Sequence, residues 1–178
     1  MAKKEKEFYL CVIGASAGGL DAISQLLNHL PEPSNPLSIL IAQHLSPTHK
    51  SRLVELLQKA TKWPVQEAKH GDLIEPGKVY ITPPDKDVSV NVKKLALTKP
   101  SSSIGPKPSV NMLFTTASEH FKNRLIGVIL SGSGSDGATG VEEVKSKGGI
   151  VLVQEPREAA YDGMPNAAIE TGMVDATF

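Results

Sequence analysis

Apolar runs alternate along the chain with segments in which apolar positions recur every three or four residues. A continuous apolar run indicates a buried strand, and a periodic segment indicates a helix with one buried face. The apolar runs are residues 8–13, 37–42, 125–130 and 150–153. The periodic segments are residues 20–30, 53–60, 110–121 and 137–147, and Met164-Pro165 opens a last short helix. This alternation predicts an α/β fold with a mainly parallel sheet covered by helices.

The middle of the chain has a different pattern, in which short β-like segments are separated by turns. These segments are residues 65–67, 78–81, 88–92 and 95–98. Pro76-Gly77 and Pro83-Pro84-Asp85 supply turn residues between them. We expect one further parallel strand and an antiparallel hairpin at an edge of the sheet.

A loop rich in proline and serine, residues 99–108, follows the expected hairpin. Strands and helices of the same kind resume after it, so it does not separate two domains. We expect a charged N-terminal tail over residues 1–7 and one domain over 8–178, long enough for a well-buried core. The chain ends soon after a last strand-like piece near Val174, as a domain excised from a longer protein would.

Composition excludes several classes of protein. Lysine plus arginine and aspartate plus glutamate each number 19, so the charge balance gives no basis for binding nucleic acid or an anionic membrane surface. Cys11 is the only cysteine, which excludes disulfides and cysteine-rich metal sites. The N-terminus lacks the apolar core of a signal peptide, and no apolar run approaches the roughly twenty residues of a membrane span. We expect a soluble cytoplasmic protein with no membrane insertion.

The turn Gly14-Ala15-Ser16-Ala17-Gly18-Gly19 joins the first apolar run to the first helical segment. Glycines suit sharp turns and positive φ angles. A serine at such a turn is exposed at the carboxyl end of a strand, where the first amides of the helix favour negative charge. The turn suits either a serine nucleophile with donors for an oxyanion or a phosphate-binding loop. Nucleotide binding is disfavoured, because the Gly-x-Gly-x-x-Gly spacing is absent and His44, not an acidic residue, ends the second strand.

Reactive side chains follow three of the expected parallel strands. Ser16 follows the first strand, His44 the second, and Asp136 the strand at 125–130. Ligands bind outside the carboxyl ends of parallel strands, so these side chains are placed to converge. A serine nucleophile, a histidine base and an aspartate that orients the histidine form an acyl-transfer site. The chain order Ser, His, Asp differs from that of α/β-hydrolases, which disfavours that fold.

Each of the three residues has a structural alternative. Ser16 also suits a turn or a helix cap, His44 a loop, and Asp136 the cap of the helix that starts at Gly137. The structural explanation requires three coincidences at three strand ends, so the triad is the better hypothesis. Among the other histidines, His49 is the best substitute for His44, because it lies near it in sequence. No set of His, Asp and Glu residues has the spacing of a metal site.

Several motifs occur along the chain in a characteristic order. The main ones are Gly14-Ala15-Ser16-Ala17-Gly18-Gly19, Gln43-His44-Leu45-Ser46-Pro47, Ser131-Gly132-Ser133-Gly134-Ser135-Asp136-Gly137-Ala138 and Tyr161-Asp162-Gly163-Met164-Pro165. Shorter ones are Gly71-Asp72, Pro76-Gly77-Lys78-Val79-Tyr80-Ile81 and Pro108-Ser109-Val110. In these motifs and their order, the chain resembles the bacterial chemotaxis protein-glutamate methylesterases, the CheB family, over nearly its whole length.

The resemblance implies a three-layer, doubly wound α/β domain with a mainly parallel sheet and an antiparallel edge hairpin. It implies hydrolysis of glutamyl methyl esters on chemoreceptors with release of methanol, and often deamidation of receptor glutamines. Ser16, His44 and Asp136 correspond to the nucleophile, the base and the orienting acid. The implied partners are the methylated cytoplasmic regions of chemoreceptors or related sensory proteins, together with receiver or methyltransferase domains of the same pathway. No cofactor is implied.

Further site residues are expected around this triad. Backbone amides near Ala17 and Gly18, and those of the Ser133-Gly134 turn, are the expected oxyanion donors. The apolar part of Met164 and the loop of residues 163–165 are expected to shape the pocket.

The chain also departs from the usual pattern of this family. Ala17 stands where the family often has threonine after the nucleophile, and Ser133 stands where it often has methionine. Asn111 follows Pro-Ser-Val, where an acidic residue is frequent. Only a few charged residues precede the first strand, where the usual enzyme carries a receiver domain. Substitutions like Ala17 and Ser133 occur in the versions fused to a methyltransferase and sensor modules, which the chain resembles more closely. These departures leave an alternative, a weak or inactive signalling module of the same fold that binds a receptor tail or a partner domain.

Overall fold

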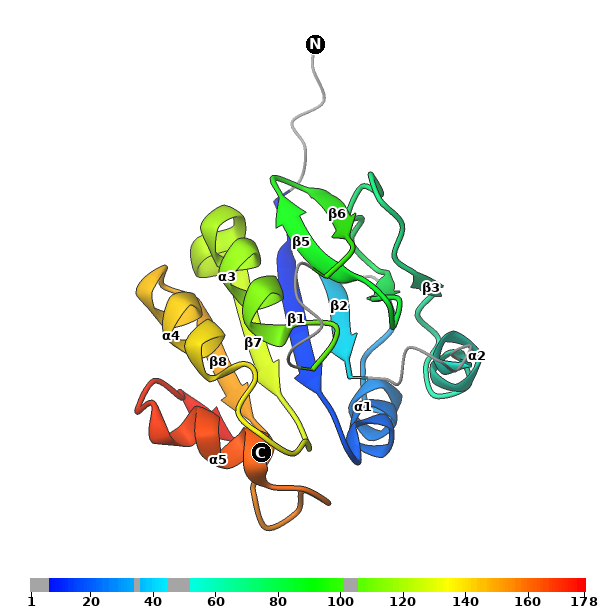
Figure 1. The fold of residues 1–178 in the computed structure, drawn as a ribbon. Helices are drawn as coiled ribbons and strands as arrows, with labels where there is room; N and C mark the ends of the chain where they lie inside the picture. Colours follow the sequence, from blue (N-terminus) through cyan, green and yellow to red (C-terminus); the bar gives the residue numbers. More distant parts are fainter. Residues whose placement is uncertain (1–6, 34–35, 45–51, 101–105) are drawn as a thin grey trace.

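The structure is a computed structural model that describes residues 7–33, 36–44, 52–100 and 106–178. Its centre is a seven-stranded parallel sheet with the order β3-β4-β2-β1-β7-β8-β9 (Figure 1). The strands are β1 (Tyr9–Ala15), β2 (Leu37–Gln43), β3 (Val65–Glu67), β4 (Val79–Ile81), β7 (Leu125–Ile129), β8 (Ile150–Val153) and β9 (Ala176–Thr177). The chain builds one half of the sheet outward from β1 and then returns to the other side of β1 with β7. The direction of winding therefore reverses at β1.

Helices cover both faces of the sheet, which gives the three layers that the sequence predicts. The helices are α1 (Gly19–Asn28), α2 (Leu53–Gln58), α3 (Val110–Phe121), α4 (Ala138–Ser146) and α5 (Gly163–Glu170), and a short 3-10 turn, η1 (Lys122–Arg124), follows α3. Side chains of β1 alternate between the two faces. Leu10 and Val12 join the buried cluster that includes α3, α4 and α5, whereas Cys11 and Ile13 join the cluster that includes α1 and α2. The predicted mainly parallel α/β fold is confirmed.

The hairpin differs in place from the sequence prediction. Strands β5 (Asp87–Asn91) and β6 (Lys94–Thr98) pair antiparallel in a two-stranded sheet of their own. Both β3 and β4 belong to the parallel sheet, so the middle of the chain adds two parallel strands where one was predicted. The hairpin is not part of that sheet. Val88, Val90 and Leu95 form an apolar face of the hairpin that is buried in the same cluster as α3. That face needs a hydrophobic partner, and α3 supplies it.

The helices in the described part of the chain fall short of the length and apolar content that crossing a membrane requires. The first described residue is Glu7, whose carboxylate forms an exposed ion pair with Arg124 at 2.8 Å. The rest of the predicted tail lies outside the described residues.

Candidate active site

Three strand ends meet at the point where the winding reverses. Strands β2 and β7 flank β1 on either side. Ser16 directly follows β1, His44 directly follows β2, and Asp136 lies in the loop between β7 and α4. All three residues line one cavity of about 730 Å³. The structure thus brings together the three residues that the sequence singles out, at the edge where parallel sheets bind ligands.

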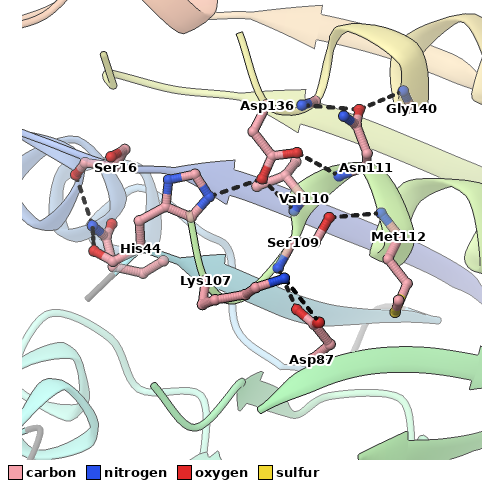
Figure 2. A network of polar contacts seen from close by, with 12 residues as sticks. Ser16, His44, Asp87, Lys107, Ser109, Val110, Asn111, Met112, Asp136 and Gly140 are labelled. Atoms are coloured by element: carbon pink, nitrogen blue, oxygen red, sulfur yellow. Dashed lines mark hydrogen bonds and ion pairs between the residues drawn. The ribbon is translucent and has the colours of Figure 1, made fainter. Parts of the chain in front are cut away.

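His44 and Asp136 form a buried pair. The His44 Nε2 atom lies 2.9 Å from Asp136 Oδ2, and the two side chains are only 8% and 10% exposed. A carboxylate accepts, so Nε2 carries the proton and Nδ1 is left as the acceptor of the neutral ring. Figure 2 shows Ser16 and Asp136 on opposite sides of the His44 ring. Relative to the serine-protease arrangement, in which Nδ1 faces the acid, the imidazole is presented the other way round.

Asp136 is held as a carboxylate by three donors. Besides His44, the amide of Val110 donates to Oδ2 at 2.8 Å and the amide of Asn111 donates to Oδ1 at 3.0 Å. Burial by itself raises the pKa of Asp136, but the hydrogen bonds from His44, Val110 and Asn111 outweigh it and hold the pKa below its ordinary value. The acid therefore stays ionised beside the histidine, as an orienting group in a triad must.

The structure corrects the capping alternative for Asp136. Gly137 is the N-cap of α4, and among the described residues the donors to the Asp136 carboxylate are His44, Val110 and Asn111, none of which belongs to α4. Instead, Asn111 Oδ1 accepts from the amides of Gly137 at 3.0 Å and Gly140 at 2.8 Å, while Asp136 binds the first amides of α3 (Figure 2). The two helices thus exchange caps: Asp136, which precedes α4, caps the N-terminus of α3, and Asn111 of α3 caps the N-terminus of α4. This exchange fixes the carboxylate relative to both helices.

The backbone on both sides of Ser16 is tied to the end of β7. The Ser16 amide donates to Ser131 O at 2.9 Å, and the Ser131 hydroxyl donates to Ala17 O at 2.8 Å. Ser131 is 1% exposed and also accepts from the Tyr161 amide at 3.0 Å. Among the described residues, the Ser16 hydroxyl forms no hydrogen bond with His44, whose ring is bonded to Asp136 alone. A hydrogen bond between Ser16 and His44 stays a prediction for the substrate-bound protein, because catalytic hydrogen bonds often tighten only when substrate binds.

The predicted oxyanion donors lie in two turns beside Ser16. Ser133 and Gly134 line the cavity. Ala17 and Gly18 form the turn between Ser16 and α1, where Gly18 has a φ of 73° and is the N-cap of the helix. Within the described part of the protein, none of these four backbone amides donates a hydrogen bond. Of the four, Ser133 and Gly134 line the cavity, whereas Ala17 and Gly18 adjoin it through Ser16.

Met164, which the sequence predicts to shape the pocket, is not among the residues that line the cavity. Its side chain is 1% exposed, and its amide donates to Gly132 O at 2.8 Å. A Cβ atom added to Gly132 would collide with the Met164 sulfur and lie 2.8 Å from Ser16 Cβ. Met164, Gly132 and Ser16 are therefore packed so closely that position 132 has no room for a side chain.

The profile of the family described as CheB methylesterase matches residues 11–178. The chain belongs to this family. A protein of Pyrococcus horikoshii named protein-glutamate methylesterase/protein-glutamine glutaminase is 36% identical over 167 residues, which are 92% of this chain and 45% of that protein. A putative protein of the same name from Leptospira interrogans is 38% identical over 169 residues, 92% of this chain and 85% of that protein. The crystal structure of the Thermotoga maritima CheB methylesterase catalytic domain matches with a TM-score of 0.88 at 31% identity, over 97% of this chain and 93% of that one.

The CheB methylesterase family, which the sequence motifs predict, is therefore confirmed, and so is the α/β fold predicted with it. The chain spans less than half of the Pyrococcus protein, 45% of its length. Of the predicted motif around His44, residues 45–47 lie outside the described residues, as does the substitute His49.

The structure places further residues at this candidate site that the sequence did not single out as functional. Lys107, Ser109 and Thr139 line the cavity beside the triad. Behind them Asp87, 2% exposed, accepts from the Ser109 amide at 2.7 Å and lies 3.4 Å from the Lys107 ammonium. The Pro108-Ser109-Val110 motif was the available signal, because a serine before an apolar helix is a common N-cap. In the described part of the chain, no group of His, Cys, Asp and Glu side chains is arranged to hold a metal ion.

Proposed function

We propose that this chain hydrolyses glutamyl methyl esters on the cytoplasmic regions of chemoreceptors or related sensory proteins, with Ser16 as nucleophile. The observation that carries the proposal is the buried His44–Asp136 pair, which shares one cavity with Ser16 at three adjacent strand ends. The names of the Pyrococcus and Leptospira relatives support the same substrate class, a glutamate methyl ester or a glutamine on a protein.

In the proposed reaction each of the three side chains has one role. The Ser16 oxygen attacks the ester carbonyl while its proton passes to Nδ1 of His44, and Asp136 stabilises the resulting imidazolium through Nε2. Collapse of the tetrahedral intermediate breaks the bond to the methoxy group, which takes the proton from His44 and leaves as methanol. Water, deprotonated by the same histidine, then attacks the acyl-enzyme. The products are a glutamate carboxylate and regenerated Ser16.

The negative charge on the tetrahedral oxygen needs preorganised donors. The amides of Ala17 and Gly18 and those of Ser133 and Gly134 are the candidates, because they flank Ser16 and have no partner within the described protein. They are backbone groups, so replacing the family's frequent threonine and methionine with Ala17 and Ser133 keeps the donors themselves. The same acyl-enzyme forms from a glutamine side chain when ammonia is the leaving group, which accounts for the glutaminase activity in the names of the relatives.

The test is to incubate the protein with a chemoreceptor cytoplasmic fragment that a methyltransferase has methylated, and to measure methanol. The wild-type protein is expected to release methanol in proportion to the methyl ester consumed, and Ser16→Ala is expected to release none above background. Ser16 is a small side chain at a turn, so its loss should change the melting temperature little. A wild-type protein that binds the fragment without releasing methanol would instead be the signalling module of the alternative hypothesis.

A further inference from the structure

Gln43 occupies the last position at which β1 and β2 run side by side. It lies opposite Ala15 in the final pair of the parallel register, and the His44 amide makes the next bond, to Ala15 O, at 2.9 Å. Beyond this point β1 turns at Ser16 into α1. The backbone ladder therefore ends at the very residues that carry the nucleophile and the base. Gln43 itself is buried, with 5% exposed.

The Gln43 carboxamide joins the two backbone segments just beyond the last backbone hydrogen bond between them. Its Nε2 donates to Ser16 O at 2.7 Å and to His44 O at 3.1 Å, so one side-chain group bridges the two catalytic positions. This orientation of the amide is fixed, because the reverse would set Oε1 against two carbonyl oxygens. Oε1 is buried and has no hydrogen-bond partner in the described protein, and a Cβ atom on Gly19 would collide with it. An unpartnered buried oxygen is unfavourable for folding, so the packing alone does not explain a glutamine here.

The bridge also sets the direction of a catalytic donor. Ser16 O accepts a second hydrogen bond, from the Gly19 amide at 2.9 Å, so the carbonyl is held from two sides. The Ser16–Ala17 peptide is trans and planar, so the Ala17 N–H points opposite to this carbonyl. With the carbonyl directed at Gln43 Nε2 and the Gly19 amide, the Ala17 N–H points away from both, and it has no partner within the described residues.

We propose that Gln43 is a positioning residue for the ester hydrolysis: it orients the Ser16–Ala17 peptide so that the Ala17 amide serves as an oxyanion donor, and it fixes Ser16 relative to His44. This inference rests on the proposed function. It assigns Gln43 no contact with the substrate, because its side chain is buried and is not among those that line the cavity.

The test compares Gln43→Met with wild type in the hydrolysis of p-nitrophenyl acetate, a probe that needs a nucleophile and oxyanion donors but no receptor recognition. Methionine keeps the length and volume of glutamine and removes the bridge. We expect kcat to fall by about a hundredfold, the usual cost of a misplaced reacting group or a lost oxyanion donor, with KM nearly unchanged. Inhibition by a boronic acid, which forms a tetrahedral adduct on serine, should weaken in parallel. A merely structural role would lower the melting temperature without this split between kcat and KM.

The matched control is Thr82→Val. Thr82 follows β4, the neighbour of β2, and is 1% exposed. Like Gln43 it carries a buried oxygen that has no partner among the described residues, but it does not bond to Ser16 or His44. This variant should keep wild-type kcat. If Gln43→Met does not fold, Gln43→Asn takes its place, since it keeps the carboxamide but is too short to reach both carbonyls.

The outcomes separate the two proposals. A folded Gln43 variant with wild-type kcat and boronic-acid affinity, beside an inactive Ser16→Ala, overturns the role of Gln43 and leaves the proposed function standing. Hydrolysis by Ser16→Ala at the wild-type rate overturns both.

Discussion

Replacing Asp136 with asparagine separates the catalytic role of this residue from its structural one. The carboxylate accepts three hydrogen bonds, from His44, Val110 and Asn111. An amide has one oxygen, so at best it keeps the two bonds made to Oδ2 and sets its NH2 group against the Asn111 amide. Hydrogen bonds to charged groups contribute about 1.5–3 kcal/mol each, so we expect the free energy of unfolding to fall by about that amount.

The catalytic effect of Asp136→Asn should be far larger. In the other orientation of the amide its NH2 group faces His44 Nε2, which must then lose its proton, so that Nδ1 carries the proton and can no longer accept one from Ser16. In either orientation the charge that stabilises the imidazolium is gone. Ser-His-Asp enzymes lose about ten-thousand-fold in kcat on this change. We expect a loss of that order, with the fold retained.

Methanol release and urea unfolding, measured on the same preparations, check both expectations. Asp175→Asn is the control, because Asp175 also accepts from a side chain, Lys145, and from a backbone amide, that of Val151, but lies away from the cavity. That variant should keep full activity. Hydrolysis by Asp136→Asn within a few-fold of wild type would remove Asp136 from the triad and leave it as the cap of α3.

The stability difference should also depend on pH with a definite sign. The pKa of Asp136 is lowered in the folded protein, so its contribution to stability is complete above the unfolded value of about 4 and is lost as the pH falls through the folded pKa. The stability gap between wild type and Asp136→Asn should therefore be widest near neutral pH and narrow under acid. A gap that stays constant from neutral pH to strong acid would contradict the bonding described for this carboxylate.

Three other perturbations follow from the structure. Asn111→Ala removes the acceptor for the Gly137 and Gly140 amides, so it should lower the free energy of unfolding by about 0.5–2 kcal/mol and also lower the activity. Asn111→Asp keeps an acceptor oxygen and should be as stable as wild type. Equal melting temperatures for Asn111→Ala and wild type would contradict the capping of α4 by Asn111. Burial raises the pKa of Cys11 to about 12, so Ellman's reagent should react with this thiol only after unfolding, and rapid labelling of the native protein would contradict its burial. Gly132→Ala should lower both the melting temperature and the rate of hydrolysis, because the new methyl group meets Met164 and Ser16; unchanged values would show that the loop yields freely.

The parallel sheet could be predicted from the sequence because its central strands are apolar on both faces. In β1 every residue after Tyr9 is buried, and β2 is similar, so both read as continuous apolar runs. The hairpin could not be placed in the same way. Residues 65–67 and 88–92 are both short and both mix valine with polar residues, and only the packing of Val88 and Val90 against α3 shows which of them leaves the sheet.

The same distinction holds for the site. Ser16, His44 and Asp136 could be selected because each follows a predicted strand, and strand ends converge in a parallel sheet. The strand order β2-β1-β7 was not needed for that selection, whereas the packing of α3 beside α4 brings Asp136 to the first turn of α3. Which imidazole nitrogen faces the acid depends on side-chain geometry, and no sequence pattern encodes it.

Reaction with a fluorophosphonate tests most directly whether the His44–Asp136 pair makes Ser16 a nucleophile. The protein is treated with the reagent, its intact mass is measured, and the modified residue is located by peptide mapping. We expect one phosphonyl group on Ser16 of the wild-type protein, much slower labelling of Asp136→Asn and none of Ser16→Ala. A wild-type protein that stays unlabelled, or that carries the group on another residue, would contradict this role of the pair.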